Sequence, residues 1–464
     1  MRLPGFIDSH LHVLGIGYFE SIVDLSQCQS IEDLINLLKK YTNRPMIIGR
    51  GWNQDQFSEK RMVSKNDLNE VSKDIPIMVT RVCGHVIAVN DKMLELANIH
   101  DKSKQILGGH FDYESGIFSE KALSLIHRVI PKPNKELLKE YFLLADKILL
   151  KNGITAVASD DFCVFENSYE EIIEVLKELY DQGLMKVKIT EQVNLPLDKL
   201  KDFIAKGYVR KQVHPKFKMG PLKILADGSL GGRTAALLEA YSDSPNEKGI
   251  LTYTDEELFE LIHLADIHGM DTTVHAIGDL TTKQVIQTIG KSMEISQRYE
   301  HSHAIIHAQL TRNHQIPLME KYNIGAIVQP IFINTDIKII EDRLGYRTND
   351  VYLFKSMFNK IRLGFSTDAP IEPVNPFYNI YTAITYKSIK YPNEKSLNEN
   401  QRFSLEDALK AYTINNLDFI YQDQLDSKDY IIIDKDIYHI STEEIKNIKV
   451  LKTFIDGEEV FSAI

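Results

Sequence analysis

Eight short runs of apolar, often β-branched residues alternate with longer helical stretches along most of this 464-residue chain. Their lengths and residue types are those of strands buried on both faces. Strands that alternate with helices form parallel sheets, and eight of them favour a closed (β/α)8 barrel over a doubly wound sheet. The predicted strands are Gly5–His12, Gly153–Ser159, Lys186–Val193, Phe217–Asp227, Asp271–Ala276, Ala304–Gln309, Gly325–Pro330 and Arg362–Asp368.

The helices between these strands are predicted from apolar residues that recur every three to four positions. Tyr169–Asp181, Asp255–His268 and Lys283–Glu294 all show this spacing. Thr254 stands where an N-cap is needed, and Gly269 stands where the second of these helices should end.

Two segments do not follow the alternation of strands and helices. Residues from about 43 to 133 separate the first two strands and contain a strand of their own, Ile75–Val82, so we interpret them as an insertion over the barrel mouth. Near the end of the chain, Asp429–Ile433 and Lys449–Phe461 are rich in β-forming residues. The predicted domains are therefore a barrel over residues 1–425 and a small C-terminal β-subdomain over residues 426–464.

Charge and composition limit the partners. Asp and Glu number 65 against 54 Lys and Arg, and the resulting net charge of -11 repels nucleic acid and anionic membranes. No apolar run approaches the roughly 20 residues of a membrane helix, and the first residues do not form the apolar core of a signal peptide. The three cysteines, Cys28, Cys83 and Cys163, form no CxxC pair. We expect buried thiols in a reducing, cytoplasmic compartment.

The first strand ends in a pair of histidines. His10 and His12 are two residues apart, so in a strand both side chains face the same side. Two imidazoles at that spacing can bind one metal ion. A bare pair of this kind is equally compatible with two unrelated polar residues at a strand end.

Three further polar residues close other predicted strands, where barrel enzymes place their active residues. They are His275, His307 and Asp368. Taken alone, a histidine there is more often a hydrogen-bonded core residue than a ligand. Burying each of these side chains without a partner would cost several kcal/mol, and one shared divalent cation satisfies them all.

Lys223 is a cation within an otherwise apolar strand. A buried ammonium group is costly unless it is neutralised or chemically changed. Carboxylation by carbon dioxide would convert it into an anionic oxygen ligand that bridges two metal ions. The alternative is a strand-end lysine paired with Asp227 or Asp160.

Taken together, these motifs resemble the amidohydrolase superfamily, and within it the YtcJ-like branch that includes N-substituted formamide deformylases. Each motif alone is weak, but the combination is specific and covers almost the whole chain. The matching segments are Pro4–His12, Gly51–Asn53, Gly84–His85 with Asn90, Lys223–Ala235, Val274–Asp279, His307–Gln309, Ser366–Pro370, Ala408 with Ala411–Asn415, and Asp456–Gly457.

The resemblance implies a TIM-barrel hydrolase with one or two divalent metal ions, and the histidine-rich ligand set favours Zn²⁺. It implies that His10 and His12 are first-strand metal ligands, that Lys223 is a carboxylated bridging lysine, and that Asp368 is both a ligand and the proton carrier. It also implies that His275 and His307 are the next two metal ligands. The expected reaction is hydrolysis of an amide or formamide-like C–N bond by metal-activated water.

Other readings stay open at this stage. The same site residues serve hydrolysis of cyclic amides, esters or ring amino groups, and an inactive barrel would act as a binding protein. The partner is expected to be a small-molecule substrate, and a homo-oligomer is also compatible with the sequence. His85 in the insertion and Arg233 in the glycine-rich loop are candidate substrate-binding residues, with surface or core placement as the alternative.

The chain also departs from the family pattern. Relatives usually begin with several dozen residues of β-strands, whereas the Pro-Gly-Phe-Ile-Asp motif starts here at Pro4. The β-sandwich that both ends of the chain normally build is therefore expected to be incomplete. Ile306 stands where the family has an acidic residue before the sixth-strand histidine, which puts outer support of His307 in question.

Overall fold

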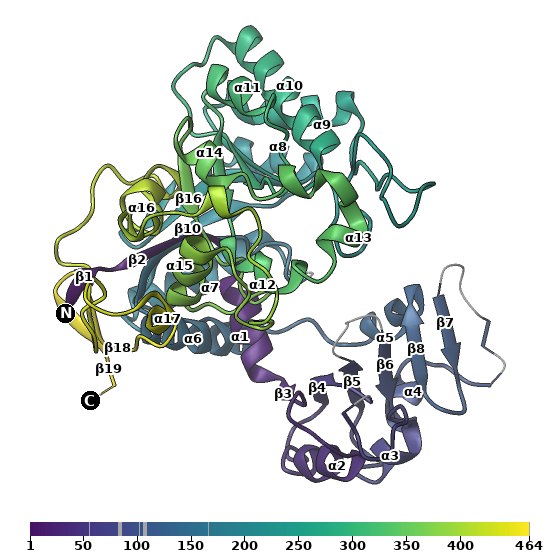
Figure 1. Cartoon of the computed structure of the whole chain (residues 1–464). Helices are drawn as coiled ribbons and strands as arrows, with labels where there is room; N and C mark the ends of the chain where they lie inside the picture. The colour runs from purple at the N-terminus through teal and green to yellow at the C-terminus, as the bar shows by residue number, and fades with distance from the viewer. Residues whose placement is uncertain (55, 82–85, 102, 105–108, 166, 464) are drawn as a thin grey trace. The chain divides into compact units, whose positions relative to one another are not determined.

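The computed structural model describes residues 1–464 except 55, 82–85, 102, 105–108, 166 and 464. It contains two compact units, both drawn in Figure 1. One unit comprises Met1–Gly17 together with Lys135–Ile464, and the other comprises Tyr18–Asn134.

The first unit is built on a parallel barrel, which confirms the predicted fold. Along the barrel the strand order is β16-β15-β14-β13-β12-β10-β9-β2, and β11 (Gln212–His214) pairs with β12 outside this path. Ser9 Oγ donates to Phe365 O at 3.0 Å and the Asp368 amide donates to His10 O at 3.0 Å, which brings the two ends of the sheet together. The strands are β2 (Phe6–Leu11), β9 (Ile154–Ser159), β10 (Lys188–Val193), β12 (Phe217–Leu225), β13 (Thr272–Ala276), β14 (Ala304–His307), β15 (Gly325–Val328) and β16 (Leu363–Phe365).

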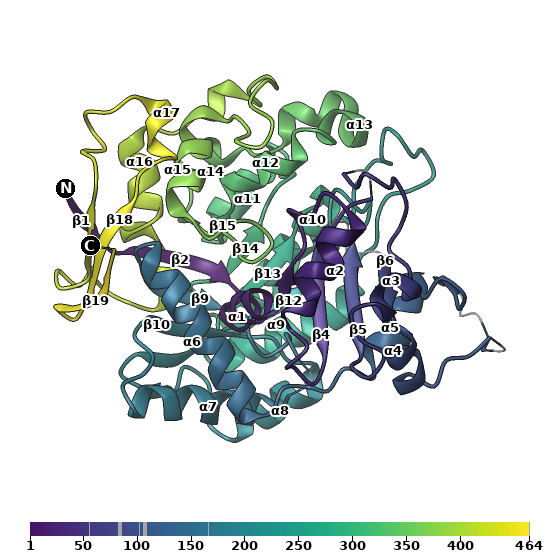
Figure 2. The same ribbon diagram turned by 90° about the horizontal axis from the view of Figure 1, so that it is seen from below.

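Helices surround this sheet, as Figure 2 shows. The three predicted helices are present, with α9 bounded as expected: the Thr254 hydroxyl accepts the Glu257 amide at 3.2 Å, and Gly269 lies at φ +76° beyond the end of the helix. The longer barrel helices are α1 (Val13–Ser21), α6 (Lys135–Lys151), α7 (Tyr169–Asp181), α8 (Leu197–Ala205), α9 (Asp255–Ile267), α10 (Asp279–Ser296), α15 (Pro376–Thr385) and α16 (Leu405–Ala411).

The close approach of α1 to α6 depends on Gly17. A Cβ atom at Gly17 would lie 1.8 Å from the carbonyl oxygen of Tyr141, so only glycine fits there. We expect Gly17→Ala to destabilise the protein by about 1–3 kcal/mol through forced backbone shifts. Gly231→Ala is the matched control, because the nearest atom to its Cβ would be 3.4 Å away. Urea unfolding of both variants measures the difference; equal midpoints would contradict this packing argument.

The second unit has its own sheet and its own apolar core. The strand order is β3-β4-β5-β6-β8-β7, and apolar clusters such as Leu34–Trp52–Val79 and Ile87–Met93–Phe118 fill the space beside it. The unit begins at Tyr18, whereas the sequence placed the start near residue 43. Its elements are β3 (Val23–Asp24), α2 (Ile31–Lys39), β4 (Ile47–Trp52), α3 (Lys65–Asn69), β5 (Ile77–Arg81), β6 (Val86–Val89), α4 (Asp91–Leu96), β7 (Gly109–Asp112), β8 (Ile117–Glu120) and α5 (Ser124–His127).

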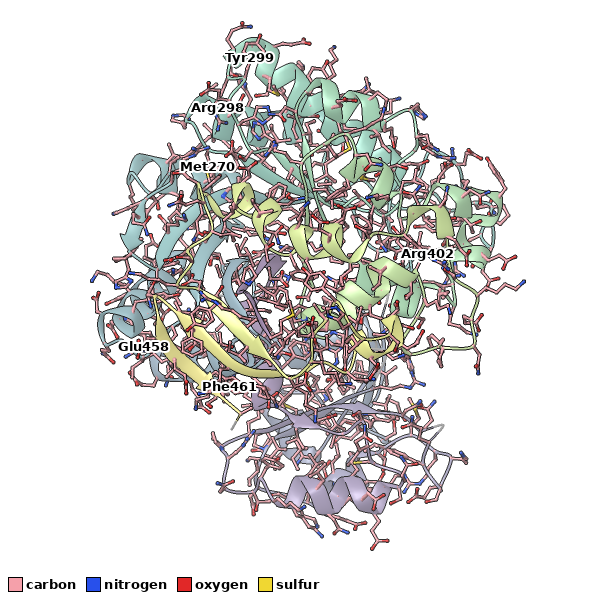
Figure 3. The ribbon with its side chains drawn as sticks, turned by 60° about the vertical axis from the view of Figure 1, so that its left-hand side comes forward. Met270, Arg298, Tyr299, Arg402, Glu458 and Phe461 are labelled. Atoms are coloured by element: carbon pink, nitrogen blue, oxygen red, sulfur yellow. The ribbon has the colours of Figure 1, made fainter. Side chains whose placement is uncertain are left out.

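A small antiparallel sheet joins both ends of the chain. Its order is β1-β17-β18-β19, formed by β1 (Arg2–Pro4), β17 (Tyr430–Ile433), β18 (Val450–Ile455) and β19 (Glu458–Ser462). Figure 3 shows this sheet, with two residues of β19 labelled. Thr453 Oγ1 donates to Leu150 O at the end of α6 at 2.7 Å. Strand β17 therefore pairs with β1, and β18 contacts the barrel through Thr453.

Among the helices of the described residues, none has both the length and the hydropathy that crossing a membrane requires.

Candidate metal centre

His10 lies on strand β2, and His12 lies between the end of β2 and the start of α1. The helix α1 begins directly afterwards, and two side chains from the β9 end cap its first amides. Ser159 Oγ accepts the Val13 amide at 2.9 Å, and Asp161 Oδ1 accepts the Leu14 amide at 2.7 Å. These contacts fix the backbone at His12, so both imidazoles are held at the carboxyl end of the barrel strands.

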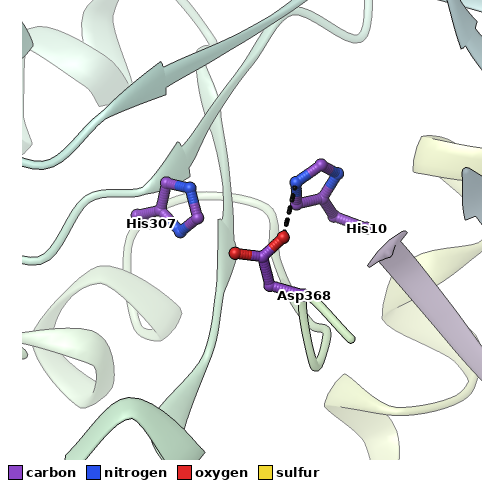
Figure 4. Close-up of side chains that lie close together, drawn as sticks. All are labelled: His10, His307 and Asp368. Carbon is purple, nitrogen blue, oxygen red and sulfur yellow. Dashed lines mark ion pairs between the residues drawn. The ribbon is translucent and has the colours of Figure 1, made fainter. Parts of the chain in front are cut away.

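Asp368 follows β16 and meets both histidines. Its Oδ1 atom lies 3.2 Å from Nε2 of His10 and 3.2 Å from Nε2 of His12. Figure 4 shows the contact with His10 and places His307 on the other side of the carboxylate. Donor atoms around a tetrahedral zinc ion at about 2.0–2.1 Å are separated by roughly 3.3–3.4 Å. Both nitrogen–oxygen distances are therefore close to the separation of two ligand atoms around one ion.

His275 and His307 complete the group of imidazoles from neighbouring strands. The centroids of their rings are 4.4 Å apart, and those of His10 and His307 are 6.0 Å apart. His10, His307 and Asp368 offer ligand atoms that lie within 4.8 Å of one another. Residues from four separate strand ends are thus brought into one cluster.

Two members of this cluster have an unusual backbone. His307 lies at φ +75° and Asp368 at φ +57°, in the left-handed region that residues other than glycine seldom occupy. Such conformations cost about 1–3 kcal/mol each and concentrate at functional sites. Their presence at two predicted ligands favours a functional role for this cluster.

Each of the four rings has one nitrogen held by an oxygen acceptor of the protein. In a neutral ring, the nitrogen that donates to such an oxygen carries the only ring proton, so the other nitrogen presents a lone pair. Among the described residues, neither His275 Nδ1 nor His307 Nε2 has a hydrogen-bond partner. The contacts are His10 Nδ1 with Gln192 Oε1 at 2.6 Å, His12 Nδ1 with Asp160 O at 2.7 Å, His307 Nδ1 with Gln329 Oε1 at 2.8 Å and His275 Nε2 with Gly228 O at 3.0 Å.

The hydrogen bonds of the histidine rings show whether a cation fits between these rings and Asp368. A neutral His10 turns the Nε2 lone pair toward Asp368 Oδ1, which is also an acceptor, so the 3.2 Å contact sets two acceptors against each other. Protonated His12 instead donates Nε2–H to the same oxygen at 3.2 Å. A divalent cation in place of that proton would turn both nitrogen–oxygen contacts into ligand pairs. The donor set of imidazole and carboxylate suits Zn²⁺.

Electrostatics agrees with this assignment. Burial lowers the pKa of His10, and burial also holds the pKa of His307 well below its ordinary value. Burial pushes the pKa of Asp368 upward, but the close ring nitrogens of His10 and His12 outweigh it and keep that pKa well below its ordinary value. Burial likewise lowers the pKa of His12, but the Asp368 hydrogen bond prevails and raises it to about 9. Asp368 is therefore an anion, and His10 and His307 are neutral.

Lys223 lies on β12 and is almost fully buried. Its Nζ atom is 3.5 Å from Asp160 Oδ2, which resolves the two alternatives for an ion-pair partner in favour of Asp160. Asp227 instead accepts the amides of Ile277 and Gly278. Asp160 also accepts the Asn194 side-chain amide at 3.1 Å. The role of Lys223 as a metal ligand stays a prediction.

One of the two predicted substrate-binding residues, Arg233, lies in the described part of the chain. Arg233 forms a two-point ion pair with Asp243, through Nε at 3.1 Å and Nη2 at 2.9 Å. Because this contact already satisfies the guanidinium, a substrate would have to replace Asp243. His85 lies outside the described residues. Both roles stay predictions.

Sequence reasoning missed the residues that orient the ligands. Gln192 is on β10 and Gln329 directly follows β15; both side chains are buried. A buried glutamine needs partners for its amide, so a glutamine at the end of an apolar strand was the available signal. Phe332 was missed as well; its ring stacks on His307 with centroids 5.6 Å apart.

The orientation of both glutamine amides is fixed by their own donors. Gln192 Nε2 donates to Ser9 O at 3.1 Å, and Gln329 Nε2 donates to Ser366 Oγ at 2.7 Å. Their Oε1 atoms must therefore face the histidines.

We expect Gln192→Leu to weaken metal binding about 10- to 100-fold, because His10 loses the partner that fixes its tautomer. Competition with a chromogenic chelator measures this dissociation constant. Gln192→Glu keeps an acceptor and should restore most of the affinity. Gln284→Leu is the matched control, because that buried amide contacts Tyr253 O and no ligand. Wild-type affinity in Gln192→Leu would contradict the orienting role.

Comparison with known proteins identifies similar chains. A family model described as "Amidohydrolase family" matches residues 1–461. The putative amidohydrolase YtcJ of Bacillus subtilis strain 168 is 31% identical over 484 residues, covering 99% of this chain and 89% of that protein. The N-substituted formamide deformylase of Arthrobacter pascens is 20% identical and covers 98% of this chain and 87% of that protein.

A solved structure is also similar. The uncharacterised metal-dependent hydrolase of Pyrococcus horikoshii OT3 superimposes with a TM-score of 0.81 and 31% identity, over 95% of this chain and 87% of that one. The resemblance that the motifs predicted is thereby confirmed.

Proposed function

Because the chain belongs to the amidohydrolase family, we propose that it is a metal-dependent hydrolase that cleaves an amide or formamide-like C–N bond of a small molecule. The observation that carries this proposal is the position of Asp368 Oδ1, 3.2 Å from the inner nitrogens of both His10 and His12. Both imidazoles approach the same carboxylate oxygen, and the opposite nitrogen of each ring is held by a protein acceptor, which supports a preorganised cation site.

The proposed ligands form two sets. His10, His12 and Asp368 would hold one ion, and His275 and His307 extend the set on the neighbouring strands. We propose Zn²⁺ as the ion. A bound divalent cation supplies Lewis-acid chemistry, polarising a carbonyl and lowering the pKa of water toward about 7.

Asp368 is the proposed proton carrier. Its Oδ1 faces the two histidines, while Oδ2 has no hydrogen bond among the described residues. This second oxygen can accept a proton from the attacking water and later deliver it to the leaving amine. Asp368 is buried, as are His10 and His307.

The chemical state of Lys223 determines whether the site holds one or two metal ions. Carboxylation would replace its ammonium by an anion beside Asp160, whose carboxylate is 3.5 Å away. Two anions at that distance in a buried site require a further cation between them. A carboxylated Lys223 therefore implies two ions, and an unmodified Lys223 is neutralised by Asp160.

The test combines elemental analysis of the purified protein with a panel of N-acyl and N-formyl amines. We expect stoichiometric zinc after dialysis and hydrolysis of members of this panel. Turnover confined to cyclic amides, esters or ring amino groups would show that the same site cleaves a different kind of bond. A protein that retains no metal and hydrolyses none of these compounds would be a binding barrel, and the proposal would be wrong.

A further inference from the structure

Three polar side chains, Gln309, Asp336 and Tyr352, form a hydrogen-bonded group that the proposed reaction does not use. Gln309 Nε2 donates to Asp336 Oδ2 at 2.6 Å and to the Tyr352 hydroxyl at 2.6 Å. The Tyr352 hydroxyl donates to the same Asp336 oxygen at 2.7 Å. The amide, the phenol and the carboxylate therefore hold one another in fixed orientations.

This group lies next to the His307 side of the candidate metal centre. Gln309 comes two residues after His307, which ends β14. Asp336 ends the short helix α12 (Ile333–Asp336), one helical turn after Phe332. The Phe332 ring stacks on His307 with centroids 5.6 Å apart. Both segments thus start at the carboxyl rim of the barrel, where a substrate of the metal centre would bind.

Two oxygen atoms of the group have no hydrogen-bond donor among the described residues. They are Gln309 Oε1 and Asp336 Oδ1, because the contacts above use only Gln309 Nε2 and Asp336 Oδ2. Gln309 is only 2% exposed, and the contacts of Nε2 fix the direction of Oε1. Neither oxygen belongs to the fully enclosed polar atoms without a partner, such as His301 Nε2, so both are accessible from solvent. Since both atoms can only accept, they favour a ligand that presents N–H donors.

The surroundings of Asp336 also lack a compensating cation. The neighbouring carboxylate is Glu372, which is 7% exposed and accepts the Thr335 hydroxyl at 3.0 Å. In the described part of the chain, no Lys or Arg forms an ion pair with Asp336 or Glu372. Burial raises the pKa of Asp336, and burial with a smaller contribution from Asp336 raises the pKa of Glu372 to about 7. A cation beside these carboxylates would stabilise both.

We propose that Asp336 and Gln309 form a subsite for a protonated amino group, and that the substrate is a small amide carrying a second, positively charged amine. Asp336 Oδ1 and Gln309 Oε1 accept N–H bonds of the ammonium group, and Glu372 contributes negative charge nearby. This inference rests on the proposed function, because it names the substrate class of that same site.

Isothermal titration calorimetry with two matched compounds provides the test. N-acetyl-1,4-diaminobutane ends in an ammonium group, and N-pentylacetamide has a methyl group in its place. We expect the purified wild-type protein to bind the amino compound about 10- to 100-fold more tightly, as for a hydrogen bond to a charged group. Homologous pairs with two to six methylene groups extend the comparison to shorter and longer spans.

Two variants locate the preference. Asp336→Asn keeps an oxygen for the Tyr352 and Gln309 donors but removes the charge, so it should bring the two affinities together. Asp342→Asn is the matched control, because Asp342 is an exposed acid on α13 (Ile340–Leu344) of the same loop. This control should keep the wild-type preference.

The outcomes separate this inference from the proposed function. Equal affinities for the amino and methyl compounds in the wild type, in every pair of the series, would overturn the subsite even if amides are hydrolysed. A preference that survives in Asp336→Asn would overturn it as well. A preference that is lost in this variant, in a protein that hydrolyses no amide, would support the subsite and contradict the proposed function.

Discussion

Asp368→Asn is expected to lower kcat about 10²- to 10⁴-fold, because an amide cannot take the proton of the attacking water. The amide oxygen still offers a ligand atom, so much of the metal should remain. Its Oδ1 position, 3.2 Å from His10 Nε2 and His12 Nε2, is retained by an isosteric side chain. Steady-state hydrolysis of the best substrate from the panel, together with metal content, measures both effects.

Asp407→Asn is the matched control for this variant. Asp407 lies in the first turn of α16 and pairs with Lys355 at 2.6 Å, so its loss removes a carboxylate without touching the cluster. We expect wild-type turnover from it. Unchanged turnover in Asp368→Asn would remove the proton-transfer role, even if the metal site were intact.

Arg298→Met is expected to lower the free energy of unfolding by about 3–5 kcal/mol. Arg298 lies just beyond α10, as labelled in Figure 3, and its guanidinium contacts two fully buried carboxylates. Nη1 is 2.9 Å from Asp266 Oδ1 and Nη2 is 2.5 Å from Asp271 Oδ1. Removing the cation leaves two buried charges with reduced compensation.

The pH dependence of this effect has a defined sign. Burial pushes the pKa of Asp266 upward, but hydrogen bonds, first from His303, outweigh it and hold that pKa below its ordinary value. A lowered folded-state pKa contributes stability above the unfolded pKa of about 3.9, and this stability is lost as the pH falls through the folded-state value. The cost of Arg298→Met should therefore be largest near neutral pH and shrink as the carboxylates become protonated.

Urea unfolding at neutral and acidic pH measures both the loss of unfolding free energy and its dependence on pH. Arg402→Met is the matched control, since Arg402 pairs with the exposed Glu399 and its loss should cost no more than about 1 kcal/mol. Equal effects of the two substitutions would show that Arg298 is not needed to compensate Asp266 and Asp271.

The barrel could be predicted from the sequence because its strands are local patterns. The run before His275 and the run before His307 are each apolar and β-branched, and each is a strand whose carboxyl end carries the histidine. Parallel pairing then brings the ends of neighbouring strands to one rim, so the approach of His10, His275, His307 and Asp368 follows from topology. The insertion was harder to delimit, since α2 has the amphipathic pattern of a barrel helix.

The contacts that orient the cluster could not be predicted in this way. Gln192 meets His10 across 182 positions of sequence, and Gln329 meets His307 across 22. Which amide faces which ring depends on the stagger of neighbouring strands, which periodicity does not determine. The exposure of Cys163 likewise depends on the path of a loop, whereas the sequence predicted a buried thiol.

Anomalous diffraction at the zinc edge, from crystals of the protein grown with zinc, tests the central claim most directly. We expect a peak bonded to His10 Nε2, His12 Nε2 and Asp368 at about 2.0–2.2 Å. A zinc-loaded crystal with no anomalous peak among these residues, or with peaks only at the surface, would contradict the assignment of this cluster as a metal centre.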